Sequence, residues 1–124
     1  MLTARIAVIA SGGGTNLQAL IDAQGRGELK SGSLTLVIAD KAGIGAIGRA
    51  GKAGIPCAVI VRKEPEFEEK VLASLAEYNI DLVVLAGFLG IFSGGFIQKF
   101  HGLIINIHPA LIPSFCGKGF YGLR

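Results

Sequence analysis

Two hydrogen-bonding side chains, Asn106 and His108, stand two residues apart at the end of the apolar run L-I-I-N-I. If this run is a strand, its alternation places both on one face, with Ile105 and Ile107 on the other. Pro109 follows and cannot continue a ladder of backbone hydrogen bonds. An amide donor beside an imidazole suits oxyanion stabilisation and proton transfer in acyl-group chemistry. From these residues alone, a buried pair satisfied by backbone groups is an equal alternative.

A second candidate site is the glycine loop S-G-G-G-T-N-L-Q, which directly follows the first apolar run. Glycines let the backbone approach a phosphate closely, and the free N–H groups at a helix start attract an anion. A tight turn with an N-cap and no ligand is the simpler alternative. The position after a first strand favours a phosphate site, with these candidate ligands: Gly12, Gly13, Gly14, Thr15 and Asn16.

The kind of phosphate ligand is a separate question. A dinucleotide fingerprint needs G-x-G-x-x-G, but Gly12 and Gly14 are followed by Leu17 where the third glycine belongs. Asp40 ends the second apolar run, where a ribose-binding acid would lie, so an NAD-type site competes. No Lys-Ser/Thr pair follows the glycines, which excludes a P-loop. A phosphate monoester fits the loop better.

Short apolar runs alternate with longer mixed segments along the whole chain. The runs are nearly continuous in apolar residues, as is typical of parallel strands covered on both faces. They predict strands at residues 5–10, 34–39, 57–61, 82–86 and 103–107.

The segments between the runs have helical length. Residues 66–78 and 16–23 repeat apolar positions at three- and four-residue steps. Residues 44–53 form a weaker candidate, because three glycines each cost a helix about 1 kcal/mol. The alternation predicts an α/β fold with a doubly wound, mostly parallel sheet. In such a sheet the glycine loop and the end of 103–107 lie on the same edge.

The composition bounds the class of protein. The chain has 124 residues, 51% of them hydrophobic, which predicts one packed domain, residues 1–124. No apolar stretch approaches the length of a membrane-spanning helix, and the first run leads into a glycine loop rather than a cleavage site. The net charge of +3 is scattered and does not indicate nucleic-acid binding. Two cysteines without C-x-x-C spacing fit a reducing cytoplasm and predict no metal site.

Three stretches together resemble the N-terminal portion of the phosphoribosylglycinamide formyltransferases of purine biosynthesis. They are S-G-G-G-T-N-L-Q, L-V-V-L-A-G-F-L and N-I-H-P-A-L-I-P, and the resemblance covers the whole chain. The element N-x-H-x-x-L-x-P is shared with methionyl-tRNA formyltransferase and formyltetrahydrofolate deformylase. Thr15 and Asn16 in the glycine loop select the glycinamide ribonucleotide branch, which uses that loop to hold the ribose phosphate.

The resemblance implies a mechanism and a co-substrate. The amine of 5-phosphoribosylglycinamide would attack the formyl carbon of 10-formyltetrahydrofolate, without a metal. Asn106 would hydrogen-bond the formyl oxygen, and His108 would stabilise the charge and protonate the departing folate nitrogen. The resemblance further implies a folate-binding set, comprising Phe88, Leu89, Gly90, Ile91 and Asn106.

The chain also departs from the family pattern. Asp40 stands where the family commonly has Asn, and Gly90 where several relatives carry Arg. The family's catalytic Asp lies downstream of the histidine, and this chain ends at Arg124 before reaching it. Asp22 and Asp81 are unsuitable substitutes, one within a helix and one at a strand start. We therefore expect a fragment or natural short form, truncated after the fifth strand and inactive alone, whose uncovered apolar surface favours a homo-oligomer.

The departures leave other functions open. The alternatives are a non-catalytic NAD-type or remnant binding module, and a formyl enzyme directed at methionyl-tRNA or formyltetrahydrofolate.

Overall fold

Five parallel strands form one sheet in the order β3-β2-β1-β4-β5. The computed structural model describes residues 4–29, 32–86 and 92–107. Along the chain the elements are β1 (Ala4–Ala10), α1 (Thr15–Gly25), β2 (Gly32–Ala39), α2 (Gly45–Lys52), β3 (Cys57–Val59), α3 (Phe67–Glu77), β4 (Leu82–Ala86), α4 (Gly94–Lys99) and β5 (Leu103–Ile107).

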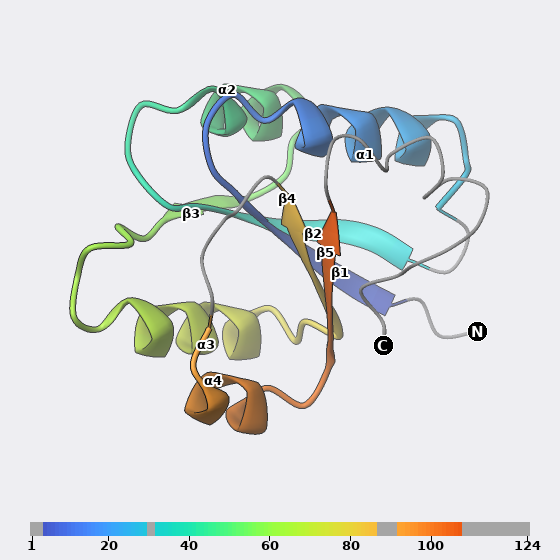
Figure 1. Ribbon diagram of the computed structural model, residues 1–124. Coiled ribbons are helices and arrows are strands. Elements are labelled where there is room, and N and C mark those ends of the chain that lie inside the picture. Colours follow the sequence, from blue (N-terminus) through green and yellow to red (C-terminus); the bar gives the residue numbers. More distant parts are fainter. Residues whose placement is uncertain (1–3, 30–31, 87–91, 108–124) are drawn as a thin grey trace.

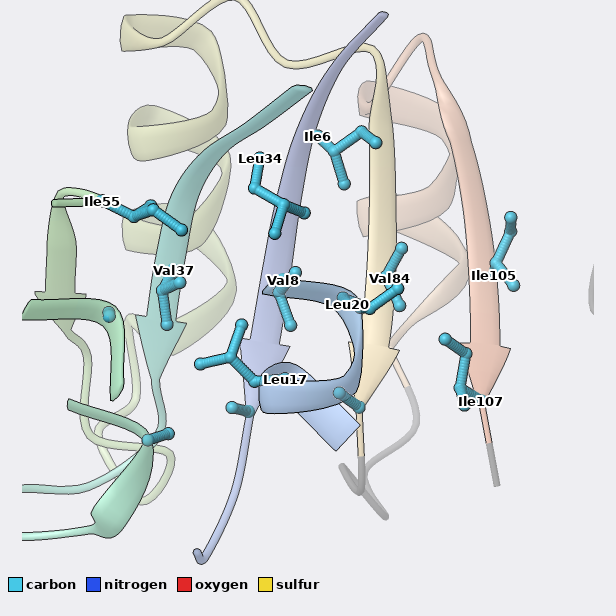
Figure 2. Close-up of a cluster of buried hydrophobic side chains, with 14 residues drawn as sticks. Ile6, Val8, Leu17, Leu20, Leu34, Val37, Ile55, Val84, Ile105 and Ile107 are labelled. Carbon is cyan, nitrogen blue, oxygen red and sulfur yellow. The ribbon is translucent and has the colours of Figure 1, made fainter. Parts of the chain in front are cut away.

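The helices cover the sheet on both faces, with α1 and α2 on one side and α3 and α4 on the other (Figure 1). Each face has its own apolar core. Under α1 and α2 lie alternate strand residues such as Val8 and Val37 (Figure 2). Under α3 and α4 lie the intervening residues, such as Ile9 and Ile38. Burial on both faces explains why the strands are nearly continuous in apolar residues, and the doubly wound parallel sheet is confirmed.

The predicted strands and the three predicted helices are present. In α3 the residues Phe67, Val71 and Leu75 are buried, as their spacing predicts. The third strand is shorter than expected, since β3 ends at Val59 rather than at residue 61. None of the described helices combines the length and the apolar character needed to cross a lipid bilayer.

Helix α4 is the element that the sequence pattern did not predict. It has six residues and begins with two glycines, so its own propensity is low. Local contacts at its start and bonds to Glu68 of α3 stabilise it instead. Phe96 is 1% exposed and its ring stacks on that of Phe92 at a centroid distance of 3.9 Å. Ser93 caps the helix by accepting a hydrogen bond from the Phe96 N–H.

Candidate active site

The carboxyl ends of the strands lie side by side along one edge of the sheet. Ala10 of β1 is in register with Ala39 of β2 and Ala86 of β4, and Ala86 is in register with Ile107 of β5. The glycine loop after β1 and the end of β5 therefore share this edge, as predicted. They are separated by two inter-strand spacings, or roughly 10 Å.

The glycine loop runs from the end of β1 into α1 through two left-handed residues. Gly12 has a φ of +81° and Gly14 a φ of +82°, and Gly14 is the N-cap of α1 without a side-chain cap. A Cβ on Gly14 would lie 2.8 Å from the Cα of Ala46 in α2. The loop thus needs glycine at Gly14 for two reasons, backbone conformation and close packing against α2.

Helix α2 holds the loop from its other side. The N–H of Ala46 donates to the Gly12 carbonyl at 3.4 Å, and Arg49 Nε donates to the Gly13 carbonyl at 2.8 Å. Gly45 lets α2 approach, because a Cβ there would lie 2.8 Å from the Gly13 carbonyl oxygen. Arg49 was not identified from the sequence. The sequence did contain one indication of its position. Arg49 follows Gly45 by four residues, which places both on the same side of a helix.

Two buried polar side chains at this edge each have an oxygen atom without a partner. Asn16, in the first turn of α1, and Asp40, directly after β2, are each 5% exposed. Among the described residues, no donor bonds the Oδ1 of either side chain. The Asp40 N–H donates to the Ala10 carbonyl at 3.3 Å, so the backbone of Asp40 lies next to the end of β1, where the glycine loop begins. Because buried polar atoms are rarely left unpaired, both are candidates to receive hydrogen bonds from a ligand.

Asn106 has the predicted orientation in β5. It is exposed, while its neighbours Ile105 and Ile107 are each 5% exposed and face the core under α1 (Figure 2). Asn106 is in register with Leu85 of β4, which belongs to the opposite core, so its side chain is on the α3 and α4 face. The buried alternative is therefore wrong for Asn106. His108 lies outside the described residues.

The expected folate-binding residues Phe88, Leu89, Gly90 and Ile91 also lie outside the described residues. The segment after them is well anchored. Ser93 donates to the Glu68 carboxylate through its N–H at 2.8 Å and its hydroxyl at 2.6 Å. These bonds to Ser93 lower the pKa of the Glu68 carboxyl below its ordinary value. Glu68 therefore ties the start of α4 to α3.

Asp81 and Asp22, the two other acids considered in the sequence, do not lie at this edge of the sheet. Asp81 Oδ2 accepts a hydrogen bond from the Arg5 N–H at 2.8 Å, at the opposite, amino end of the sheet. Asp22 Oδ1 accepts from Gln18 Nε2 at 2.9 Å on α1. In the described ranges no cluster of His, Cys, Asp and Glu side chains is arranged to hold a metal ion.

An NAD-type site is not favoured. Leu17, at the third position of the dinucleotide fingerprint, is fully buried in the core between α1 and the sheet. A glycine there would allow close helix–strand packing in a dinucleotide site, whereas here a large apolar side chain fills the space.

Comparisons with known proteins agree with this geometry. Residues 4–122 match the family described as formyl transferase. The chain is 47% identical over 119 residues to the human trifunctional purine biosynthetic protein adenosine-3, covering 93% of this chain and 12% of that protein. It is 40% identical over 121 residues to the phosphoribosylglycinamide formyltransferase of Haemophilus influenzae, covering 94% of this chain and 57% of that protein.

A solved structure shows the same fold. The glycinamide ribonucleotide transformylase 1 of Geobacillus kaustophilus superposes with a TM-score of 0.79 at 38% identity, over 94% of this chain and 63% of that chain. The resemblance inferred from the sequence motifs is thereby confirmed. The chain spans less than two thirds of the length of each of these relatives.

Proposed function

Because the chain belongs to the formyl transferase family, we propose that it carries the phosphate-binding part of a phosphoribosylglycinamide formyltransferase. The reaction would transfer a formyl group from 10-formyltetrahydrofolate to the amine of 5-phosphoribosylglycinamide in purine biosynthesis. One observation supports this most strongly. The glycine loop and Asn106 lie on one edge of the sheet, separated by two inter-strand spacings, or roughly 10 Å.

In this proposal the residues Gly12 to Asn16 hold the ribose phosphate. The first turn of α1 provides N–H groups that have no partner within the helix, and the helix dipole favours an anion at that end. Asn16 adds a buried polar group whose Oδ1 is available to a ligand hydroxyl. The protein would thus fix the phosphate and let the amine extend along the edge toward β5.

Asn106 and His108 would carry the chemistry. The Asn106 amide donates a hydrogen bond to the formyl oxygen as the amine attacks the formyl carbon and that oxygen gains negative charge. His108 stabilises this charge and transfers its proton to the folate nitrogen as the bond between that nitrogen and the formyl carbon breaks, and the imidazole then takes up the proton that the attacking amine loses. The apolar residues Phe88, Leu89 and Ile91, with Gly90, would line the pterin pocket.

The proposal has consequences for the setting of the protein. Its substrates would be small molecules, and it would lie in the cytoplasm. Cys57 fits this setting, because it is a free cysteine and burial raises the pKa of its thiol, which keeps it protonated. Association of two copies through exposed apolar residues at the sheet edges, such as Leu103 of β5, stays a prediction.

Calorimetric titration of the 124-residue chain with 5-phosphoribosylglycinamide tests the binding step. We expect a dissociation constant in roughly the micromolar to millimolar range, and at least about tenfold weaker binding by Asn16→Ala, which loses a buried hydrogen-bonding group. Gln98→Ala, on the exposed side of α4, is the control and should bind normally. No binding by the unaltered chain, or equal binding by Asn16→Ala, would contradict the proposal.

Formyl transfer tests the chemical step. Any turnover measured with 10-formyltetrahydrofolate should be abolished by His108→Ala, because the departing nitrogen then has no proton donor. Turnover that survives this substitution would remove His108 from its proposed role.

A further inference from the structure

The glycine loop does not hold its shape alone. Two consecutive carbonyl groups of the loop, those of Gly12 and Gly13, accept hydrogen bonds from α2. The first comes from the backbone N–H of Ala46, and the second, shorter one from the side chain of Arg49. The orientation of two adjacent peptide planes in the loop is therefore set by a helix that begins more than 30 residues later in the chain.

These carbonyl bonds also orient the N–H groups of the loop. In a planar trans peptide, the C=O of one residue and the N–H of the next point in opposite directions. With the Gly12 and Gly13 carbonyls turned toward α2, the N–H groups of Gly13 and Gly14 are turned away from it. Within the described part of the chain no acceptor bonds either N–H. Successive N–H groups pointing to one side of a loop form an anion-binding concavity.

Arg49 is itself held in place. Its Nη1 donates to Gln18 Oε1 on α1 at 3.1 Å while its Nε bonds the Gly13 carbonyl at 2.8 Å, so the guanidinium bridges the loop and both helices. Gly14 and Gly45 are packed too closely against the facing backbone to accept a Cβ. The loop has little room to move toward α2, and Arg49 prevents the Gly13 peptide from rotating away.

We propose that Arg49 is a positioning residue for phosphate binding, acting through the Gly13 carbonyl to keep the N–H groups of Gly13 and Gly14 directed at the ligand. The proposal rests on the proposed function, since it assumes that the loop receives the ribose phosphate. It adds a residue outside the loop, on α2, whose hydrogen bond to the Gly13 carbonyl makes the loop able to bind phosphate. The positive charge of Arg49 further favours an anion at the loop.

Two variants and a matched control test this role. Arg49→Met removes the charge and both hydrogen bonds, and Arg49→Lys keeps the charge and one possible donor. Lys52→Met removes a positive charge from the last turn of the same helix. Each 124-residue chain is titrated with 5-phosphoribosylglycinamide. The amide resonances of Gly13 and Gly14 are followed by NMR during addition of the ligand.

We expect Arg49→Met to bind about tenfold more weakly, the effect of losing a hydrogen bond to a charged group, and Arg49→Lys to recover part of the affinity. Lys52→Met should bind as the unaltered chain does. The Gly13 and Gly14 amide shifts induced by ligand should shrink in Arg49→Met at saturating ligand. A role limited to stability would lower the melting temperature but leave those shifts in the folded protein unchanged.

The outcomes are distinguishable. If the unaltered chain binds and Arg49→Met binds equally well, the inference is overturned while the proposed function stands. Weaker binding with unchanged amide shifts would mean that Arg49 contacts the ligand directly, which also overturns the positioning role. No binding by the unaltered chain overturns both proposals. Should Arg49→Met fail to fold, the same two measurements on Arg49→Lys decide the question, because reduced affinity with altered amide shifts is expected there too.

Discussion

Adding one methyl group to different glycines of the loop should separate backbone strain from steric contact. Gly12 and Gly14 have nearly the same left-handed conformation, with φ of +81° and +82°. They differ in their surroundings. A Cβ on Gly12 would meet nothing within 4 Å, whereas a Cβ on Gly14 would lie 2.8 Å from the Cα and 3.0 Å from the Cβ of Ala46. Gly13 has neither a positive φ nor a close neighbour, so it is the reference position.

The expected costs follow from these differences. Gly12→Ala should lower the free energy of unfolding by about 1 kcal/mol, the left-handed penalty less the reduced entropy of the unfolded chain. Gly14→Ala carries the same left-handed penalty and must also displace α2, because the backbone of Ala46 cannot rotate aside. Its free energy of unfolding should therefore fall by about 2–4 kcal/mol in total. Gly13→Ala should change stability by less than about 0.5 kcal/mol.

Urea unfolding of the three variants, with unchanged m-values, measures these differences. Equal losses for Gly12→Ala and Gly14→Ala would refute the reasoning, because they would mean that α2 does not pack against the loop at Gly14. A loss of more than about 1 kcal/mol in Gly13→Ala would equally contradict the open space assigned to that position.

Three further predictions concern residues around the site. Glu68→Gln should lower stability at neutral pH by less than about 1 kcal/mol, since solvent screens this exposed carboxylate. The bonds to Ser93 lower the pKa of Glu68 on folding, so the stability that Glu68 contributes is complete above its ordinary pKa of 4.5 and is lost as the pH falls through the lower pKa of the folded state. When the urea midpoint is followed into acid, it should therefore decline less steeply in the variant than in the unaltered chain. Parallel curves would contradict the bond. Phe96→Ala should lower the free energy of unfolding in urea by about 3–5 kcal/mol, because it opens a cavity. Ile97→Ala, at an exposed position of the same helix, should lower it by less than about 1 kcal/mol. Similar losses for the two variants would show that α4 is not anchored as described. Asp81→Asn should leave the calorimetric affinity for 5-phosphoribosylglycinamide unchanged, because Asp81 lies at the amino end of the sheet, and a large loss would place that carboxylate in the site.

Much of the fold was predictable because its pattern is local. A strand covered on both faces needs apolar side chains in both directions, so β1, β2, β4 and β5 appear as nearly continuous apolar runs. The periodic apolar positions of α3 mark its buried side in the same way. Helix α2 was harder to predict, because Gly45 weakens a helix while being required where α2 meets the Gly13 carbonyl.

Helix α4 was missed for the opposite reason. Its sequence is short and begins with two glycines, and locally only the cap at Ser93 and the contact of Phe92 with Phe96 favour a helix. Its stability comes from the stack of Phe96 on Phe92 and from the bonds between Ser93 and Glu68, a residue of α3. Contacts between residues 25 positions apart leave no periodic signal along the chain.

The sequence by itself determined the parallel α/β sheet, the glycine loop at the end of its first strand, and the placement of Asn106 on the strand face opposite Ile105 and Ile107, because each follows from strand periodicity and from the chain connection between neighbouring elements. Only the tertiary structure showed that Asn16 and Asp40 are buried without partners for their Oδ1 atoms, and that Arg49 of α2 bonds the Gly13 carbonyl. Those properties arise where β1, β2, α1 and α2 converge. Burial and hydrogen bonding between distant segments depend on that packing, which no single stretch of the chain encodes.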